Sequence, residues 1–506
     1  MIKIIDCGSQ LTQNIARRVR ELGVFSEILP YNASLSEIFT NDLEGLIISG
    51  GQFSVYDKNA PLYSSEILER GIPVLGICYG QQSIAHLLGG RVTPTENREY
   101  GATKVQLLKD TLLFNGINEK EINVWMSHGD IVEQVPEGFK IIARSQSSHI
   151  SSMEKGNIYA VQFHPEVDNT TYGRKILDNF IGICNAKRDW DPNKDYDRII
   201  AEIKEQIKGK IGLGGISGGV DSSAASVLAG NLAGNSYYPI FVDNGLLRLN
   251  EAYEVRISLE PFGLNINYVD ASERFLSKLR DITDPDEKRK IIGHEFIAVF
   301  EEEAMKIRGA SYLVQGTLYP DVIESVPIYG ASSKIKRHHN VGGLPEKMGL
   351  KIVEPFRKMF KDEVRKIAGH KLGLPKEIVW RHPFPGPGLA VRIIGDITPR
   401  KLELVRKADA IFIEELKKKD LYYNISQAFA GLLGSKSIGV MGDEGTYQYV
   451  VGLRAVVTND FMTADWYDFK KEDLTTITNR IINEVKGANR VMYDTTQKPP
   501  GTIEWE

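Results

Sequence analysis

Residues 211–228, IGLGGISGGVDSSAASVL, contain the strongest local signal for a fold in this chain. An apolar, glycine-containing run of the kind found in buried strands is followed by a Gly-Gly turn, after which Asp221 and two serines open an alanine-rich helix. Glycines let a phosphate approach the backbone, and the free N–H groups at a helix N-terminus attract its charge. The stretch predicts a phosphate site between a strand and a helix. The alternative is an ordinary strand-turn-helix with an aspartate N-cap.

The loop differs from a Walker A loop, because Val220-Asp221 stands where that motif has its lysine. The phosphate-binding loop is predicted to comprise Ser217, Gly218, Gly219, Val220, Asp221, Ser222 and Ser223. A carboxylate facing phosphates would be repelled without a metal, so Asp221 is expected to hold a Mg²⁺ that bridges the phosphates. The sequence SGGVDSS resembles the loop of the ATP-pyrophosphatases, a family that adenylates a carbonyl oxygen and releases pyrophosphate.

The totals limit the class of protein. A length of 506 residues predicts two or three domains, and a net charge of −4 argues against a general nucleic-acid binder. Cys7, Cys78 and Cys184 are too few and too scattered for a disulfide framework or a zinc cluster, which favours a reducing cytoplasm. The start MIKIIDCGSQ has no features of a signal peptide, and no stretch is long and apolar enough to span a membrane. We therefore expect a cytoplasmic protein without a membrane partner.

Residues 1–188 alternate strand and helix patterns, which predicts a mainly parallel sheet with its chemistry at the carboxyl ends of the strands. Cys78 lies in Gly76-Ile77-Cys78-Tyr79-Gly80, a cysteine version of the nucleophile elbow. His164-Pro165-Glu166 follows a predicted strand over 158–163 and supplies a base with an orienting carboxylate. Taken alone, the cysteine would be read as a structural residue and the histidine as a surface or core residue.

Together with Ser49-Gly50-Gly51 and the segment 125–130, WMSHGD, these motifs resemble the class I glutamine amidotransferases. The resemblance implies that Cys78 attacks the side-chain amide of glutamine, that His164 protonates the departing ammonia and that Glu166 orients His164. It further implies an oxyanion site and a substrate contact, made by Gly51, Tyr79 and Gln82. Two positions depart from the family: Gln52 replaces a usual proline, and Cys7 replaces an aromatic residue.

Residues 189–383 are predicted to form a second doubly wound domain after a polar linker at 187–194. We expect a helix over 196–208 and three strands, at 238–243, 266–269 and 312–315, in addition to the strand at 211. The resemblance to the pyrophosphatases implies further nucleotide contacts at Val242, Asp243, Gly316 and Lys361, the lysine supplying the cation that the loop lacks.

Two segments narrow the resemblance to the GMP synthase branch of the pyrophosphatases: 316–321, GTLYPD, and 341–345, VGGLP. The basic run 334–339, KIKRHH, lies between them. It is either a solvated loop or a lid that excludes water from an adenylated intermediate.

Residues 384–506 begin with FPGPGL, which cannot continue a helix or a central strand. We expect a small α+β domain with helices over 400–419 and 475–484, short strands such as 447–455, and a docked C-terminal tail. The resemblance implies that this domain pairs two subunits and helps to bind xanthosine monophosphate (XMP). The implied XMP contacts are Arg289, Arg490, Lys498, Ile503 and Glu504, and the departures from the family are Gly434, Ser435 and Gly445.

The combination of a glutaminase elbow with a pyrophosphatase loop resembles the glutamine-hydrolysing GMP synthases over essentially the full length. That resemblance implies an α/β protein that forms a homodimer. Its substrates would be glutamine, ATP and XMP. It would adenylate XMP with Mg-ATP, release pyrophosphate, and displace AMP with ammonia to give GMP. The alternative is a nucleotide-binding interaction protein that has kept this fold without its catalysis. The presence of Cys78, His164, Asp221 and Lys361 argues against the alternative.

Overall fold

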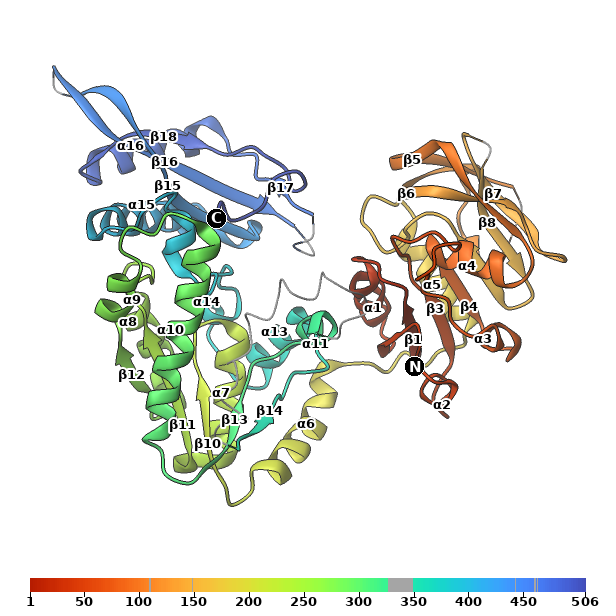
Figure 1. The fold of residues 1–506 in the computed structure, drawn as a ribbon, viewed down its shortest axis with the longest axis horizontal. Helices are drawn as coiled ribbons and strands as arrows, with labels where there is room; N and C mark the ends of the chain where they lie inside the picture. The colour runs from red at the N-terminus through yellow and green to blue at the C-terminus, as the bar shows by residue number, and fades with distance from the viewer. Residues whose placement is uncertain (109–110, 148, 326–348, 442, 459–460, 462) are drawn as a thin grey trace. The chain divides into compact units, whose positions relative to one another are not determined.

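The computed structural model describes the chain apart from residues 109–110, 148, 326–348, 442, 459–460 and 462 (Figure 1). The described residues form two compact units, the first made of Met1–Asp191 and the second mainly of residues from Pro192 onward. The predicted basic lid at 334–339 and the segment 341–345 lie outside the described residues.

The first unit is built on a nine-stranded mixed sheet. Five strands are parallel, in the order β2 (Ser26–Pro30), β1 (Ile2–Asp6), β3 (Gly45–Ile48), β4 (Val74–Ile77) and β9 (Ile158–Val161). The sheet continues antiparallel through β8 (Ile150–Lys155), β7 (Lys140–Ser145), β5 (Arg91–Leu107) and β6 (Glu121–Gln134). The predicted parallel portion is confirmed, and it carries the helices α1 (Thr12–Glu21), α4 (Tyr79–Leu87) and α5 (Gly173–Ile183). The antiparallel extension was not foreseen.

The second unit contains a five-stranded, fully parallel sheet. Its order is β12 (Asn267–Asp270), β11 (Tyr237–Asp243), β10 (Ile211–Gly215), β13 (Ala310–Val314) and β14 (Lys351–Val353). The chain therefore moves outward from the central β10 to one edge and then returns to the other edge, as in a doubly wound fold. This arrangement confirms the predicted fold class and places the loop after β10 next to the point where the strand order reverses.

Helices flank this sheet. Contacts join α6 (Pro192–Ile207), α7 (Val220–Ala233) and α13 (Lys361–His370), while α8 (Glu251–Leu259), α9 (Ser272–Lys278) and α10 (Pro285–Met305) lie toward the other side (Figure 1). Helix α6 begins at Pro192, four residues before the prediction, because proline is well tolerated at a first helical position where no backbone donor is needed. The end of the predicted linker is therefore helical.

Glycines in β10 are required by packing rather than by a turn. A Cβ atom on Gly212 would lie 2.0 Å from the ring of Tyr312, and one on Gly214 would lie 2.0 Å from the hydroxyl of Tyr237. The two tyrosines, from the strands on either side, are buried and fill the space that side chains on β10 would need.

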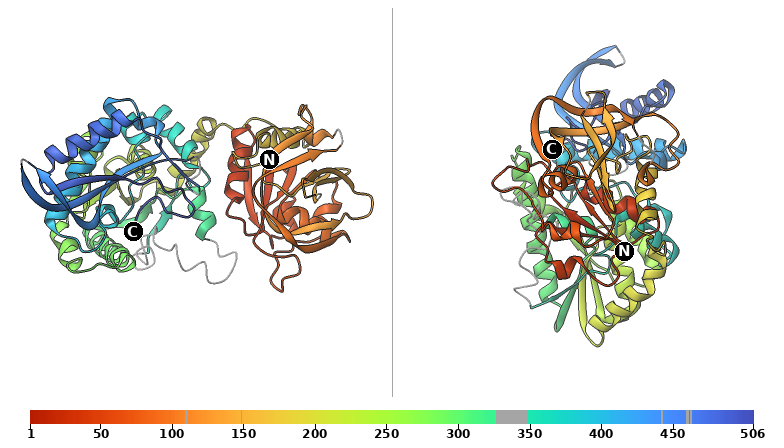
Figure 2. Two further views of the ribbon diagram at one scale, coloured as in Figure 1. Left: turned by 90° about the horizontal axis from the view of Figure 1, so that it is seen from above. Right: turned by 90° about the vertical axis from the view of Figure 1, so that its right-hand side faces the viewer.

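The C-terminal region of the second unit has a separate four-stranded sheet and two helices (Figure 2). Its strands are β15 (Gln427–Met441), β16 (Glu444–Val457), β17 (Asp465–Trp466) and β18 (Ala488–Tyr493), and its helices are α15 (Pro399–Lys418) and α16 (Lys471–Glu484). The prediction of short strands was wrong for β15 and β16, which form one long hairpin. A single hydrophobic core runs from the parallel sheet into this region and includes Leu213, Phe300, Phe412 and Val451.

The glycines that depart from the family pattern have a local explanation at one position. Gly434 has φ +73° and sits where the register of the hairpin shifts, between Leu432 and Lys436, in a conformation that glycine adopts without a steric penalty. Ser435 belongs to the same irregularity, whereas a side chain on Gly445 would meet open space. Among the described helices, none combines the length and the apolar character needed to cross a membrane.

Candidate active sites

The predicted nucleophile stands on a strained turn between β4 and α4. Cys78 has φ 53° and ψ −106°, a conformation that side chains rarely adopt, and it is nearly fully buried. Its thiol donates to the carbonyl of Ser127 at 3.6 Å, and the side-chain amide of Gln162 donates to its sulfur at 3.6 Å. The elbow predicted from the sequence is therefore present.

The two glycines of the elbow are needed because backbone passes directly beside them. A Cβ on Gly76 would lie 2.7 Å from backbone atoms of Gly80, and a Cβ on Gly80 would lie 2.4 Å from the carbonyl oxygen of Ile48. Neither neighbour is the end of a flexible side chain, so the turn closes only with glycine at both positions.

Gly80→Ala is therefore expected to lower the thermal stability of the first unit and to abolish glutamine hydrolysis, since overpacking costs about 1–3 kcal/mol. Differential scanning fluorimetry and a glutaminase assay would measure both effects. Gly182→Ala is the matched control, because Gly182 lies in helix α5 with no atom within 4 Å of its would-be Cβ. A Gly80→Ala protein with unchanged melting and glutaminase activity would contradict this account of the elbow.

The predicted base and its orienting group meet as expected. Nδ1 of His164 lies 2.7 Å from a carboxylate oxygen of Glu166, and both side chains are buried. Burial by itself would lower the pKa of His164, but the charge of Glu166, the proximity of Cys78 and the hydrogen bonds to both outweigh it and raise that pKa well above the usual value. A protonated imidazole beside the sulfur is suited to donate a proton to a leaving amine.

The predicted oxyanion residues lie at the same place. A Cβ on Gly50 would be 3.2 Å from the ring of His164, and one on Gly51 would be 2.5 Å from the carbonyl oxygen of Cys7 and 3.4 Å from the ring of Tyr79. The end of β3 is thus packed against the elbow through bare backbone. Burial, followed by the charge of Asp6, raises the pKa of the Cys7 thiol well above its usual value, which keeps this second cysteine protonated. Gln52 is exposed.

Sequence reasoning missed several residues of this site. Gln162 contacts Cys78, and it also accepts a hydrogen bond at 3.3 Å from Gln82, the predicted substrate contact, which donates to the carbonyl of Asp130 at 2.8 Å. The signal for Gln162 was available, because alternation along a strand places residue 162 on the same face as His164. The buried carboxylate of Glu99 lies 3.1 Å from Nε2 of His128. This pair joins β5 to β6, and no sequence spacing indicated it.

The predicted phosphate loop joins β10 to α7. The hydroxyls of Ser217 and Ser222 lie 2.9 Å apart, and Ser222 also accepts from the N–H of Ser217 at 3.1 Å. Gly218 has φ +79°, and Gly219 is the N-cap of α7 without a side chain to satisfy the helix N-terminus. The loop therefore leaves backbone N–H groups at the start of α7 for an anion.

Lys361 and Gly316 are brought to this loop from distant parts of the sequence. The ammonium of Lys361, the first residue of α13, lies 3.1 Å from Asp221 Oδ2, whereas the other carboxylate oxygen of Asp221 is buried without a hydrogen-bond partner. A Cβ on Gly316 would lie 2.8–2.9 Å from the backbone of Asp221 and Ser222. Val242 and Asp243 end β11, the strand beside β10.

Four of the predicted XMP contacts lie in the C-terminal tail or against it, whereas Arg490 lies on β18 and contacts the neighbouring hairpin. Ile503 is buried with Phe429, Val456 and Ala464. The guanidinium of Arg392 donates to both carboxylate oxygens of Glu504, at 2.9 and 3.0 Å. The tail is therefore docked, as predicted. The side chain of Lys498 donates to the carbonyl of Phe461, that of Arg490 donates to Ile438, and that of Arg289 donates to Glu506. Trp505 packs on the bare backbone of β15 and β16, where a Cβ on Gly431 or Gly452 would strike its ring.

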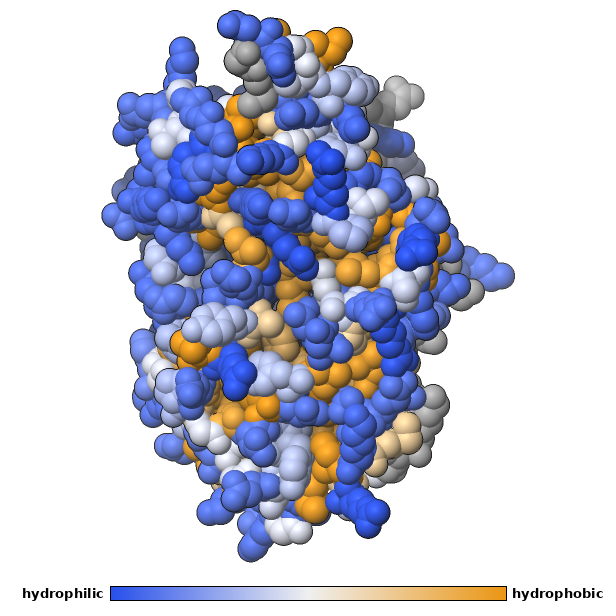
Figure 3. Space-filling model, turned by 90° about the vertical axis from the view of Figure 1, so that its left-hand side faces the viewer, coloured by the Kyte–Doolittle hydropathy of each residue, from blue (hydrophilic) through white to orange (hydrophobic). Residues whose placement is uncertain are grey.

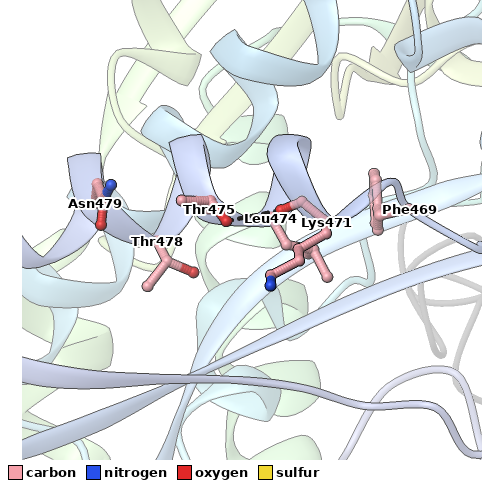
Figure 4. A pocket seen from close by; sticks show the side chains of 6 residues that line it. All are labelled: Phe469, Lys471, Leu474, Thr475, Thr478 and Asn479. Atoms are coloured by element: carbon pink, nitrogen blue, oxygen red, sulfur yellow. Dashed lines mark hydrogen bonds between the residues drawn. The ribbon is translucent and has the colours of Figure 1, made fainter.

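A surface hollow beside α16 shares no lining residue with the phosphate loop (Figure 4). Its lining consists of Phe469, Lys471, Leu474, Thr475, Thr478 and Asn479. The one ionisable side chain in this lining is that of Lys471.

Comparison with known proteins places both sites in a family. The glutamine amidotransferase class-I model matches residues 3–183, and the GMP synthase C terminal domain model matches residues 414–505. Relatives named GMP synthase (glutamine-hydrolyzing) include that of Aquifex aeolicus, 53% identical over 100% of this chain and 99% of its own length. Those of Carboxydothermus hydrogenoformans and Clostridium kluyveri are 54% and 52% identical over 99% and 100% of this chain and 99% of their own lengths. The chain belongs to the family of glutamine-hydrolysing GMP synthases.

Proposed function

We propose that this enzyme makes GMP by coupling glutamine hydrolysis in the first unit to adenylation and amination of XMP in the second. The observation that carries this proposal is the presence, in one chain that matches glutamine-hydrolysing relatives end to end, of a Cys–His–Glu triad and a pyrophosphatase-type loop. A retired, non-catalytic relative is disfavoured because the nucleophile, the base and the loop aspartate are all in place.

In the first unit, the sulfur of Cys78 attacks the side-chain carbonyl of glutamine. The proposed oxyanion donors are the backbone N–H groups of Gly51 and Tyr79, at the ends of two neighbouring strands. His164, kept protonated by its charged neighbours, donates a proton to the departing nitrogen, and Glu166 holds the imidazole in that orientation. Water then releases glutamate, and the ammonia becomes the nucleophile for the second reaction.

In the second unit, the loop 217–223 holds the phosphates that leave as pyrophosphate, and Lys361 supplies positive charge beside them. The residues fit a bound Mg²⁺, because a buried oxygen of Asp221 lacks a protein partner and Mg²⁺ characteristically takes one or two carboxylates together with phosphate oxygens. Bound there, the ion would neutralise charge on the phosphates. Val242, Asp243 and Gly316 line the proposed nucleotide subsite.

Substrate and subunit assignments belong to the same proposal. Arg289, Arg490, Lys498, Ile503 and Glu504 are proposed to surround XMP. We further propose a homodimer formed through the β15–β16 hairpin, because Ile438, Val440 and Tyr447 on it are 75%, 75% and 67% exposed. Figure 3 shows that hydrophobic patches lie between hydrophilic residues on the face that it draws. The three buried, unpaired cysteines suit a cytoplasmic enzyme.

The test of the whole proposal is formation of AMP and GMP from ATP and XMP with glutamine or with ammonia. Activity with both nitrogen sources is the expected result. Absence of AMP with either source would favour the non-catalytic alternative, and a substrate panel that adds nicotinate dinucleotide and uridine triphosphate would identify the acceptor.

Deleting Ile503–Glu506 is expected to raise the KM for XMP steeply while glutamine hydrolysis and ATP binding remain. The deletion also leaves buried Arg392 without the carboxylate of Glu504, a change that destabilises proteins by about 3–5 kcal/mol. Glu504→Gln is therefore the sharper variant, since glutamine can still accept from Arg392 yet carries no charge for the nucleotide. Steady-state kinetics with sedimentation separate the roles: a monomeric truncation with an unchanged KM for XMP would show that the tail only braces the subunit interface.

A further inference from the structure

Arg381 fixes the backbone of the phosphate loop from behind. Its NH1 group donates to the carbonyl oxygen of Gly218 at 3.2 Å. Gly218 has φ +79°, and a Cβ there would lie 2.5 Å from Val255 and 2.9 Å from Arg381. The tip of the loop is therefore closed on that side by an arginine and a valine.

The direction of this carbonyl determines where the next amide points. A trans peptide unit is planar, so its C=O and the following N–H point in opposite directions. When Gly218 directs its oxygen to Arg381, the N–H of Gly219 faces away from Arg381. That N–H makes one long contact, 3.4 Å to Ser217 Oγ, at the N-cap of α7. A reversed peptide would instead present a carbonyl oxygen to an incoming anion and repel it.

Glu251 holds the arginine in place. Its Oε1 lies 2.8 Å from NH2 of Arg381, while its Oε2 accepts from the backbone N–H of Arg248 at 2.8 Å. The carboxylate is 2% exposed and the arginine side chain 15% exposed, so this is an interior ion pair. Arg248 belongs to the loop after β11, and Glu251 opens α8. One buried carboxylate thus ties the loop after β10 to the loop after β11.

We propose that Arg381, oriented by Glu251, is a positioning residue for the phosphate loop: it keeps the Gly218 carbonyl turned inward and the Gly219 amide available to the leaving pyrophosphate. The inference rests on the proposed function, because it assigns a device to the nucleotide site of that reaction. Arg381 acts through the loop backbone. Lys361 differs in its contact, because its ammonium pairs with the carboxylate of Asp221.

The test measures binding of inorganic pyrophosphate, in the presence of Mg²⁺, to the full-length protein by isothermal titration calorimetry. Arg381→Gln and Glu251→Gln are both expected to weaken this binding about tenfold or more and to lower kcat for ammonia-dependent AMP formation. The KM for XMP and the glutaminase activity of the same preparations should change less than about twofold. Arg381→Lys, which keeps a donor for the Gly218 carbonyl, is expected to recover part of the affinity.

Arg365→Gln is the matched control. Arg365 donates to the carbonyl of Val379 at 3.1 Å and stacks on Trp380, so the substitution removes the same charge and the same kind of contact close to Arg381 without touching the loop. If Arg381→Gln only lowered the melting temperature, as the control does, and left pyrophosphate affinity intact, the positioning role would be wrong.

A second outcome would also overturn the proposal. Were Arg381 a direct phosphate contact, Glu251→Gln, which retains the arginine, would keep full pyrophosphate affinity. If Arg381→Gln fails to fold, Arg381→Lys and Glu251→Gln decide the question by the same measurement. Failure of the proposed function is distinguishable, because it appears as absent AMP formation in the unmodified protein, whereas this inference is judged by pyrophosphate binding.

Discussion

Replacing Cys78 by alanine is expected to abolish glutamine-dependent GMP formation and to leave ammonia-dependent formation nearly unchanged. The sulfur is the nucleophile of the first unit, and loss of a nucleophile in a triad enzyme lowers the rate by at least about 10³-fold. The second unit makes no use of this thiol, because its phosphate loop, lysine and tail all lie in the other compact unit. The measurement is GMP production with saturating glutamine and, in parallel, with saturating ammonium.

Cys184→Ala is the matched control for this variant. Cys184 is also a buried free thiol of the first unit, at the C-terminal end of α5, and its sulfur packs against Gly45, away from the elbow. It should retain glutamine-dependent activity. Equal loss of activity with both nitrogen sources in Cys78→Ala would contradict the separation into two reactions.

Asp221→Asn is expected to lower glutamine-dependent and ammonia-dependent GMP formation alike, by roughly 10²- to 10³-fold, while glutamine hydrolysis measured alone survives. Both synthetic reactions pass through the leaving pyrophosphate, and metal-assisted neutralisation of phosphate charge contributes several kcal/mol to such steps. The substitution removes the charge of the one carboxylate in the loop and releases Lys361 from its ion pair. A titration of activity against Mg²⁺ should show a weakened response.

The control for Asp221→Asn is Asp270→Asn. Asp270 ends β12 of the same parallel sheet, but its carboxylate is bonded within its own turn, to the N–H of Ser272 at 3.0 Å. It should keep the parent's Mg²⁺ dependence. Full ammonia-dependent activity in Asp221→Asn would show that the role assigned to this aspartate is wrong.

Local sequence determined the elements that carry chemistry. The elbow around Cys78 and the turn at Gly218 are sharp because short-range sterics leave few alternatives, and glycines at the crowded positions mark them in the sequence. The strand–loop–helix at 211–228 was predictable for the same reason, since an apolar run, two glycines and an alanine-rich segment each favour one conformation. The resemblance of these motifs to two enzyme families added their order along the chain and the expected roles of Cys78, His164 and Asp221.

Extended regions were predicted less well where long-range pairing decides the outcome. The long β15–β16 hairpin contains polar residues and glycines that suggested short strands, yet cross-strand pairing and packing against α15 stabilise it over its whole length. The antiparallel half of the first sheet likewise depends on pairing between separate segments, such as β5 with both β6 and β7. Strand propensity is a property of the neighbours as much as of the segment itself.

Tertiary structure alone decided several buried contacts of polar side chains. Glu99 reaches His128, and Arg381 reaches the carbonyl of Gly218 across 163 positions of sequence. No periodicity encodes such pairs, because a side chain finds its partner only after the sheet has fixed which loops lie side by side. The sequence determined the reacting groups of this enzyme by local geometry and residue chemistry. The folded chain determined the buried partners that orient those groups. Burying a charge without a partner is costly, so the stable fold is one in which each buried charge has a partner of opposite charge or a hydrogen bond.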